Sequence, residues 1–302
     1  MNRRRLGLLL LACVLMVTAG ILLWPREREP EYQGVSLTGW LTSYDSGVVK
    51  GNRRSFQKNE EAASAVRYIG TNSIPFLLQW MSAEPAPWRR QWRNTFQKLP
   101  HPVDRLGRLS DSVYGLKWQL RNRLALDGFE ILGPDAASAI PDLIRIMRGA
   151  RSERLWFAAV HALGSIGKDG LAPLIAALEE SPVNWRHNFS VMSVITSMEE
   201  KGINITAALP AMLQSAGDTN YVVRSGAWLI LEQLSPEKFS LYLPVLAASL
   251  HDTNEAVRVS AATLLVDIAT NVQPALLTEA TNVLRSAPPE LLERIGDARS
   301  DE

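Results

Sequence analysis

The sequence predicts an all-α protein, an α-solenoid of about six helical repeats preceded by one N-terminal transmembrane helix. Three observations predict this fold. A ten-residue segment beginning at Asp218 recurs at Asp252, an offset of 34 residues, prolines open apolar helices at similar intervals, and residues 6–24 form an uncharged apolar run. A period of about 30 to 40 residues is typical of folds in which each unit buries its apolar face only against its neighbours.

The apolar run at residues 6–24 is long enough to cross a membrane. Its 19 residues would span nearly the whole hydrocarbon core of about 30 Å as a helix rising about 1.5 Å per residue. Residues 1–5 carry three arginines, whereas arginines and glutamates alternate after the run. This charge bias predicts that residues 1–5 are cytoplasmic and that the rest of the chain faces away from the cytoplasm.

Two other interpretations of the N-terminus stay open. Residues 17–19, Val-Thr-Ala, resemble a signal-peptide cleavage site, in which case the mature protein is secreted or periplasmic. Residues 10–13, Leu-Leu-Ala-Cys, loosely resemble a lipoprotein box. Cys13 is the sole cysteine of the chain, so the folded part is expected to contain no disulfide and no cysteine-based zinc site.

A linker is expected at residues 25–54, the repeat domain at 55–287 and an acidic tail at 288–302. The two matching segments give the clearest unit of the repeat domain. Each begins with an aspartate expected to cap the following helix, has an arginine six residues later, and continues with apolar positions at helical spacing. These positions are Val223, Ala227, Ile230, Leu231 and Leu234, then Val257, Ala261, Leu264, Leu265 and Ile268.

Prolines and glycines mark the boundaries of the other helices. The prolines expected in first helical turns are Pro75, Pro141, Pro173, Pro210, Pro244 and Pro274. The first interval, from Pro75 to Pro141, is 66 residues and predicts an atypical or inserted unit, while later intervals lie between 30 and 37. Glycines expected to end helices are Gly70, Gly133 and Gly167.

The pattern over residues 55–285 resembles the HEAT-repeat family, in which a proline-started helix, a turn with aspartate and a Val-Arg-x-x-Ala helix form one unit. Residues 154–167 match less closely, and Trp185 and Phe189 stand in place of the small valine and alanine. These larger residues predict a local change in helix spacing. The resemblance implies a scaffold whose second helices line a concave binding surface, although a few relatives act on DNA or attach pigments to proteins.

Four arginines, Arg121, Arg186, Arg224 and Arg258, fall at nearly equivalent places in successive units. They could form a basic ladder for an acidic partner. The alternative, which we favour, is structural: in such repeats this arginine usually binds the turn, and Asp218 and Asp252 are placed to accept its hydrogen bonds.

Residues 85–126 carry nine basic and two acidic side chains, or +7, whereas residues 135–302 carry 13 basic and 20 acidic ones, or −7. Aromatic residues interleave these cations. The segment could bind an anionic membrane surface or nucleic acid, or its aromatic residues, at helical spacing, could be a buried helix face. Its candidate partner-binding residues are Trp88, Arg89, Arg90, Trp92 and Arg93.

Trp228 replaces the smaller Ala262 of the neighbouring copy, so it is a further candidate anchor for a partner, or else packing between units. No catalytic or metal-binding motif occurs, and no cofactor is expected. The net charge of +1 makes coating by nucleic acid unlikely. We therefore expect a membrane-anchored, non-enzymatic scaffold for a protein or peptide; the alternative is a nucleic-acid-binding or processing protein that uses residues 85–126. The oligomeric state is not predicted.

Overall fold

The computed structural model describes residues 28–48, 53–83, 103–180, 185–234, 238–271, 281–283 and 285. Helices make up most of these residues, which confirms the all-α prediction for this part of the chain. The strands in the described part are β1 (Glu31–Tyr32) and β2 (Val35–Ser36), which pair antiparallel with Tyr32 opposite Val35. Positive φ angles at Gln33 and Gly34 make the tight turn between them.

The described helices pack as successive pairs, each with a first and a second helix. Short connections join the helices of most pairs, as expected for neighbours in helical repeats. The pairs are α2 (Leu37–Val48) with α3 (Arg53–Ile69), α4 (Ile74–Met81) with α6 (Val103–Leu132), α7 (Ile140–Arg148) with α8 (Glu153–Ile166), α9 (Lys168–Glu180) with α10 (Trp185–Glu200), α11 (Leu209–Ala216) with α12 (Tyr221–Leu231), and α13 (Phe239–Ser249) with α14 (Glu255–Asn271).

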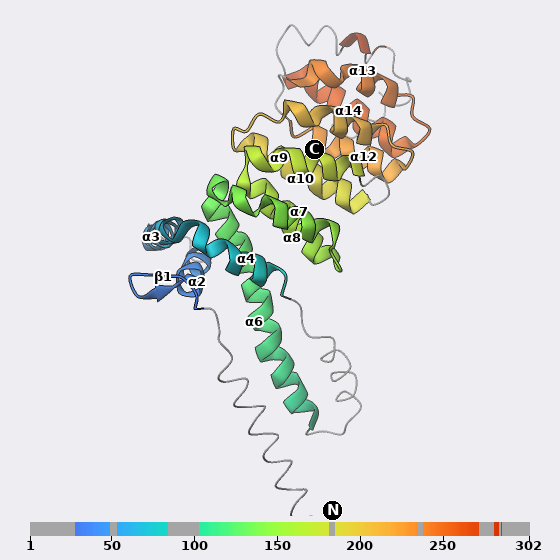
Figure 1. The fold of residues 1–302 in the computed structure, drawn as a ribbon. Coiled ribbons are helices and arrows are strands. Elements are labelled where there is room, and N and C mark those ends of the chain that lie inside the picture. Colours follow the sequence, from blue (N-terminus) through green and yellow to red (C-terminus); the bar gives the residue numbers. More distant parts are fainter. Residues whose placement is uncertain are drawn as a thin grey trace, which may run out of the picture.

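The pairs stack in chain order, from α2 and α3 at one end to α13 and α14 at the other (Figure 1). Second helices contact second helices from α6 through α8, α10 and α12 to α14, while α11 contacts both α9 and α13. Short 3₁₀ turns, η1 (Gly70–Ser73), η2 (Gly133–Ala139) and η3 (Thr206–Ala208), precede α4, α7 and α11. The stack therefore has a layer of first helices and a layer of second helices.

One continuous apolar core runs between the two layers. Positions predicted from the two matching segments lie in it: Ala227 and Leu231 of α12, and Val257, Ala261 and Leu265 of α14. Val223 of α12 is buried as well. α12 and α14 thus each contribute an apolar stripe at 3.6-residue spacing, which the neighbouring helices cover.

The glycine predictions are confirmed at three helix ends. Gly70, Gly133 and Gly167 follow α3, α6 and α8 with φ angles of 61°, 52° and 83°, a conformation that costs glycine little. Between α8 and α9 the backbones also approach closely, because a Cβ at Gly170 would lie 1.9 Å from the carbonyl oxygen of Leu163. Glycine is the residue that permits this crossing.

The proline predictions are confirmed in part. Pro75, Pro141 and Pro210 occupy the first or second position of α4, α7 and α11. Pro173 and Pro244 instead lie inside α9 and α13, which begin five residues earlier. Both lie little more than one turn from the helix start, where a proline removes at most one internal hydrogen bond.

One expected boundary, that of the linker, differs from the structure, whereas the interval predicted to contain an atypical unit does contain an unusually long helix. Residues 25–54, expected as a linker, contain the β-hairpin and α2, whose Leu37 and Leu41 are fully buried. Helix α2 was not predicted because it is short and lacks the proline and aspartate that mark the later units. The long Pro75–Pro141 interval contains α6, a single helix of 30 residues that extends beyond the stack (Figure 1).

No helix in the described part of the chain is long and apolar enough to span a membrane. The expected transmembrane segment, residues 6–24, lies outside the described residues, as does the whole of the expected acidic tail, residues 288–302.

Candidate functional site

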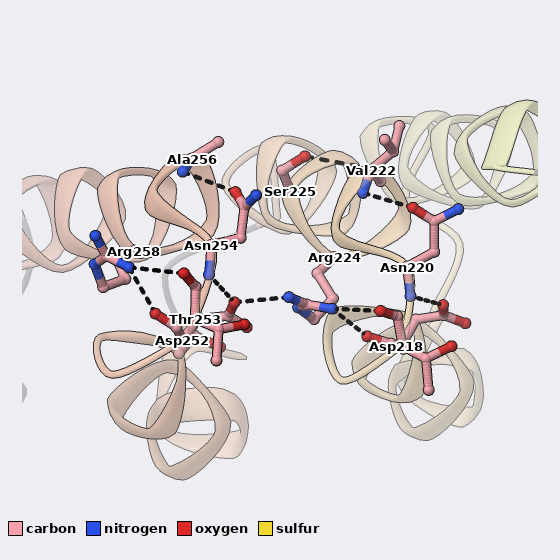
Figure 2. A network of polar contacts seen from close by, with 12 residues as sticks. Asp218, Asn220, Val222, Arg224, Ser225, Asp252, Thr253, Asn254, Ala256 and Arg258 are labelled. Carbon is pink, nitrogen blue, oxygen red and sulfur yellow. Dashed lines mark hydrogen bonds and ion pairs between the residues drawn. The ribbon is translucent and has the colours of Figure 1, made fainter.

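The turn before α12 is built by side chains that bind the backbone (Figure 2). Asp218 Oδ1 accepts a hydrogen bond of 2.7 Å from the backbone N–H of Asn220. Asn220 Oδ1 in turn accepts from the N–H of Val222 at 3.0 Å and is the N-cap of α12. The expectation that Asp218 caps the helix is therefore wrong: aspartate forms the turn and asparagine forms the cap.

The same arrangement recurs before α14. Asp252 Oδ1 accepts from the N–H of Asn254 at 2.7 Å, and Asn254 Oδ1 accepts from the N–H of Ala256 at 2.9 Å. The two copies thus share their backbone geometry as well as their sequence. This likeness allows one copy to serve as a reference for the other.

Arg224 links the two turns (Figure 2). Its Nη1 donates to the carbonyl oxygens of Asp218 and Thr219 at 2.7 and 2.9 Å, and its Nη2 donates to Asp252 Oδ1 at 2.7 Å. The Arg224 and Asp252 side chains are only 12% and 14% exposed, so little solvent screens the pair. Arg224 therefore joins the α11–α12 pair to the next pair.

Arg258 makes the same contacts with its own turn as Arg224 does, because its Nη1 donates to the carbonyl oxygens of Asp252 and Thr253 at 2.8 and 3.2 Å. The bonds made by Arg224 and Arg258 are those expected of a structural arginine rather than of a free basic ladder. The described contacts of the other two arginines, Arg121 and Arg186, include no turn aspartate; Arg186 contacts Glu153 at 3.4 Å.

The pKa of Asp252 reflects opposing effects. Burial alone would raise it, but hydrogen bonds from Arg224 and from the Asn254 N–H, together with the Arg224 charge, lower the pKa below its ordinary value of 3.8. Asp252 is therefore ionised at neutral pH, and its charge is matched by Arg224.

Trp228, predicted as a candidate partner anchor, is only 1% exposed and belongs to the core. Its ring lies 6.4 Å from that of Tyr242 of α13, between centroids. The anchor hypothesis for Trp228 is wrong, and the packing alternative is confirmed. The reason is that Trp228 lies on the buried side of α12, beside Ala227 and Leu231.

The second-helix layer carries an exposed apolar surface that we call the α10–α12 surface. It consists of Trp185 and Phe189 of α10, 43% and 40% exposed, and Tyr221 and Leu229 of α12, both 51% exposed. Among the large apolar residues that are exposed in the described part of the chain, only Val35, Tyr68 and Leu241 lie elsewhere. Exposed large side chains therefore concentrate on two neighbouring helices.

Phe189 connects the two helices of this surface. Trp185 and Phe189 are four residues apart, on one face of α10. A Cβ on Gly226 would lie 3.5 Å from the Phe189 ring, so Phe189 reaches the seam between α10 and α12. Leu229 follows Gly226 by one turn, and Tyr221 begins α12.

The sequence singles out Trp185 and Phe189 as unusually large residues, but as a cause of altered helix spacing. Their exposure was missed, because in the repeat pattern these two slots are expected to face a neighbouring helix. Tyr221 and Leu229 carry no sequence signal of their own, since single exposed apolar residues are common on protein surfaces.

A partly buried aromatic stack supports the start of α10. The His187 ring stacks on Trp156 of α8, with centroids 3.7 Å apart and an interplanar angle of 8°. Burial lowers the pKa of His187, while the nearby Glu153 charge opposes that shift, so the imidazole is neutral at pH 7. In the described residues no group of histidine, cysteine or carboxylate side chains is arranged to hold a metal ion.

The candidate residues of the basic stretch, Trp88, Arg89, Arg90, Trp92 and Arg93, lie outside the described residues. Of the same stretch, Trp118 is described: Arg154 lies over its ring, 5.1 Å from the centroid, and also donates to Asn122 Oδ1 at 2.7 Å. Trp118 thus contributes to the contact between α6 and α8.

A scan against protein-family models finds no match for this chain, and a search of curated proteins finds no similar sequence.

Proposed function

We propose that this protein is a membrane-anchored, HEAT-like α-solenoid scaffold that binds a protein or peptide partner through the α10–α12 surface. Binding requires no cofactor and no catalysis in this proposal. The observation that carries it is the concentration of Trp185, Phe189, Tyr221 and Leu229 on two adjacent second helices.

The solenoid assignment is supported by the regular pairing of helices and by contacts of second helices with second helices along the stack. The repeated Asp-Thr-Asn turns and the arginine that joins them add a repeat-specific feature. In the HEAT-like pattern that the sequence resembles, the second helices form the concave binding side, which is the layer that carries the α10–α12 surface.

An exposed cluster of this kind costs a protein solubility unless something covers it. Contiguous exposed apolar patches are typical of interaction sites, and tryptophan, tyrosine and phenylalanine are enriched at the centres of interfaces. Arg186, whose guanidinium lies 5.4 Å from the centroid of the Trp185 ring, and its partner Glu153 supply a polar edge. Because every backbone group of a helix interior is already hydrogen bonded, the partner is expected to bind through side chains.

The membrane anchor in this proposal is residues 6–24, with the repeat domain on the side away from the cytoplasm. It rests on the length and lack of charge of that run and on the arginines that precede it. The anchor would hold the binding surface near the membrane, where it meets partners of the same compartment.

Leu229 and Leu241 offer a matched test, because they are equally large and 51% and 54% exposed but lie on a second and a first helix. In pull-downs of the full chain from detergent-solubilised membranes, Leu229→Asp is expected to lower partner recovery at least tenfold, since it places a charge in an apolar interface (about 2 kcal/mol or more). Leu241→Asp is expected to leave recovery unchanged. Equal recovery with both variants would remove the α10–α12 surface from the proposal.

A further inference from the structure

We infer that the Asp218 carboxylate, beside the α10–α12 surface, is a receptor for an arginine or lysine side chain of the partner. The partner segment is therefore basic and apolar, with a cation next to the residue that covers the exposed rings. This inference rests on the proposed function and adds to it the chemistry of the partner.

The internal reference for this site is Asp252. In both turns one carboxylate oxygen accepts the N–H of the asparagine two residues later, at 2.7 Å. Asp252 Oδ1 also accepts from the guanidinium of Arg224. No cation of the described residues makes the corresponding contact with Asp218. The Asp218 carboxylate accepts a hydrogen bond from the backbone N–H of Asn220 (Figure 2). One of two near-identical carboxylates thus has its cation, and the other does not.

The preceding repeat explains why this position is open. The arginine of α10 that corresponds to Arg224 is Arg186, and it contacts Glu153 on the side of α8 and the Trp185 ring. Its side chain is 56% exposed, and none of its described contacts reaches Asp218, although Arg224 reaches Asp252. The link that joins the α12 and α14 pairs is therefore not repeated between the α10 and α12 pairs, and Asp218 is left half-exposed.

The Asp218 carboxylate and the exposed aromatic rings lie at the same edge of the second-helix layer. Asp218 precedes Tyr221, the first residue of α12, by three residues, and Trp185 is the first residue of the neighbouring α10. Because the pairs stack in chain order, the second helices α10 and α12 run in the same direction and their N-terminal ends lie at the same edge of the layer. The approach of Phe189 to the position of Gly226, each about one turn into its helix, agrees with this. A cation at Asp218 would also meet aromatic rings, which bind arginine and lysine favourably.

Charge complementarity supports a basic partner. Residues 135–302 have 13 basic and 20 acidic side chains, or −7, so this part of the chain attracts cationic segments and repels acidic ones. Arginine is the better match than lysine, because its planar fork can donate to a carboxylate and a carbonyl at once, as Arg224 does.

The test is a selection of displayed random 12-residue peptides on the full chain in detergent, followed by affinity measurements with the enriched peptides. We expect enrichment of arginine or lysine at one position next to apolar residues. Asp218→Asn, which retains the oxygen that accepts the Asn220 N–H, is expected to weaken binding about tenfold. Replacing the peptide arginine by citrulline should weaken it similarly, and the two changes together should cost little more than either alone. Glu179→Gln, an exposed carboxylate change on α9, should have no effect.

Three outcomes would contradict the inference. If peptides bind, and Leu229→Asp abolishes binding while neither Asp218→Asn nor citrulline weakens it, the proposed function stands and the Asp218 receptor is wrong. If Leu229→Asp also leaves peptide binding unchanged, or if no peptide is enriched, both the Asp218 receptor and the proposed function are wrong. Circular dichroism of Asp218→Asn checks that the turn and the helices are intact.

Discussion

Replacing Trp228 by alanine is expected to lower the free energy of unfolding by about 4 kcal/mol and the thermal midpoint by about 10 °C. The side chain is 1% exposed and packs between α12 and α13 near Tyr242, so its removal leaves a cavity that a stacked helix pair cannot easily close. Circular dichroism of the full chain during heating measures the change.

Trp185→Ala is the matched control, because the same side chain is deleted at a position that is 43% exposed. Its midpoint should stay within about 2 °C of the wild-type value, while partner binding should fall. Trp228→Phe is expected to cost less than alanine, since the buried indole N–H has no hydrogen-bond partner in the structure and its removal offsets part of the lost packing. Equal midpoints for Trp228→Ala and Trp185→Ala would contradict the placement of Trp228 in the core.

Arg224→Ala is the second change with a large expected effect, a loss of about 2 to 3 kcal/mol at pH 7. Three hydrogen bonds disappear, and the Asp252 carboxylate, only 14% exposed, loses its cation. Arg224→Lys should recover little of the loss, because one ammonium group cannot replace a fork that spans the Asp218 carbonyl and the Asp252 carboxylate. Chemical denaturation at fixed pH measures these differences.

The effect of Arg224→Ala is expected to depend on pH. The folded-state pKa of Asp252 lies below its ordinary value of 3.8, so the stabilisation by Arg224 is fully present above the unfolded pKa. It is lost as the pH falls through the folded pKa, where Asp252 becomes protonated. The gap in stability between wild type and variant should therefore be constant from pH 7 to about pH 5 and shrink below about pH 4.

Arg145→Ala provides the control for this pair. Arg145 contacts Asp142 three residues earlier on α7, but its side chain is 78% exposed, so the loss should be within about 0.5 kcal/mol. A comparable loss in Arg145→Ala and Arg224→Ala would mean that the bond between the two turns contributes nothing beyond an ordinary surface ion pair.

The repeat unit was predictable from sequence wherever a local physical rule fixes the residue. Apolar spacing predicted the buried positions of α12 and α14, and glycine's tolerance of positive φ predicted the ends of α3, α6 and α8. It was not predictable in the same way that Asp218 forms the turn and Asn220 caps α12, because either side chain can cap a helix. Only the backbone geometry distinguishes them.

The candidate surface was harder to predict than the fold. Trp185 and Trp228 both stand where the repeat pattern has a smaller residue, yet one is exposed and the other buried. Sequence spacing defines a helix face, but which face a neighbour covers depends on how the pairs stack. For the same reason the open Asp218 carboxylate has no signal in the sequence, where it looks identical to Asp252.

The most direct test of the central claim is site-specific photocrosslinking from the second-helix layer. A photoreactive phenylalanine analogue is placed at Phe189 or at Leu241 in the full chain, both positions being exposed, and membranes are irradiated before extraction. The account predicts a crosslinked protein of defined mass from position 189, absent from position 241 and lost when Leu229→Asp is combined with it. Equal crosslinking from both positions, or crosslinking from position 241 alone, would contradict it.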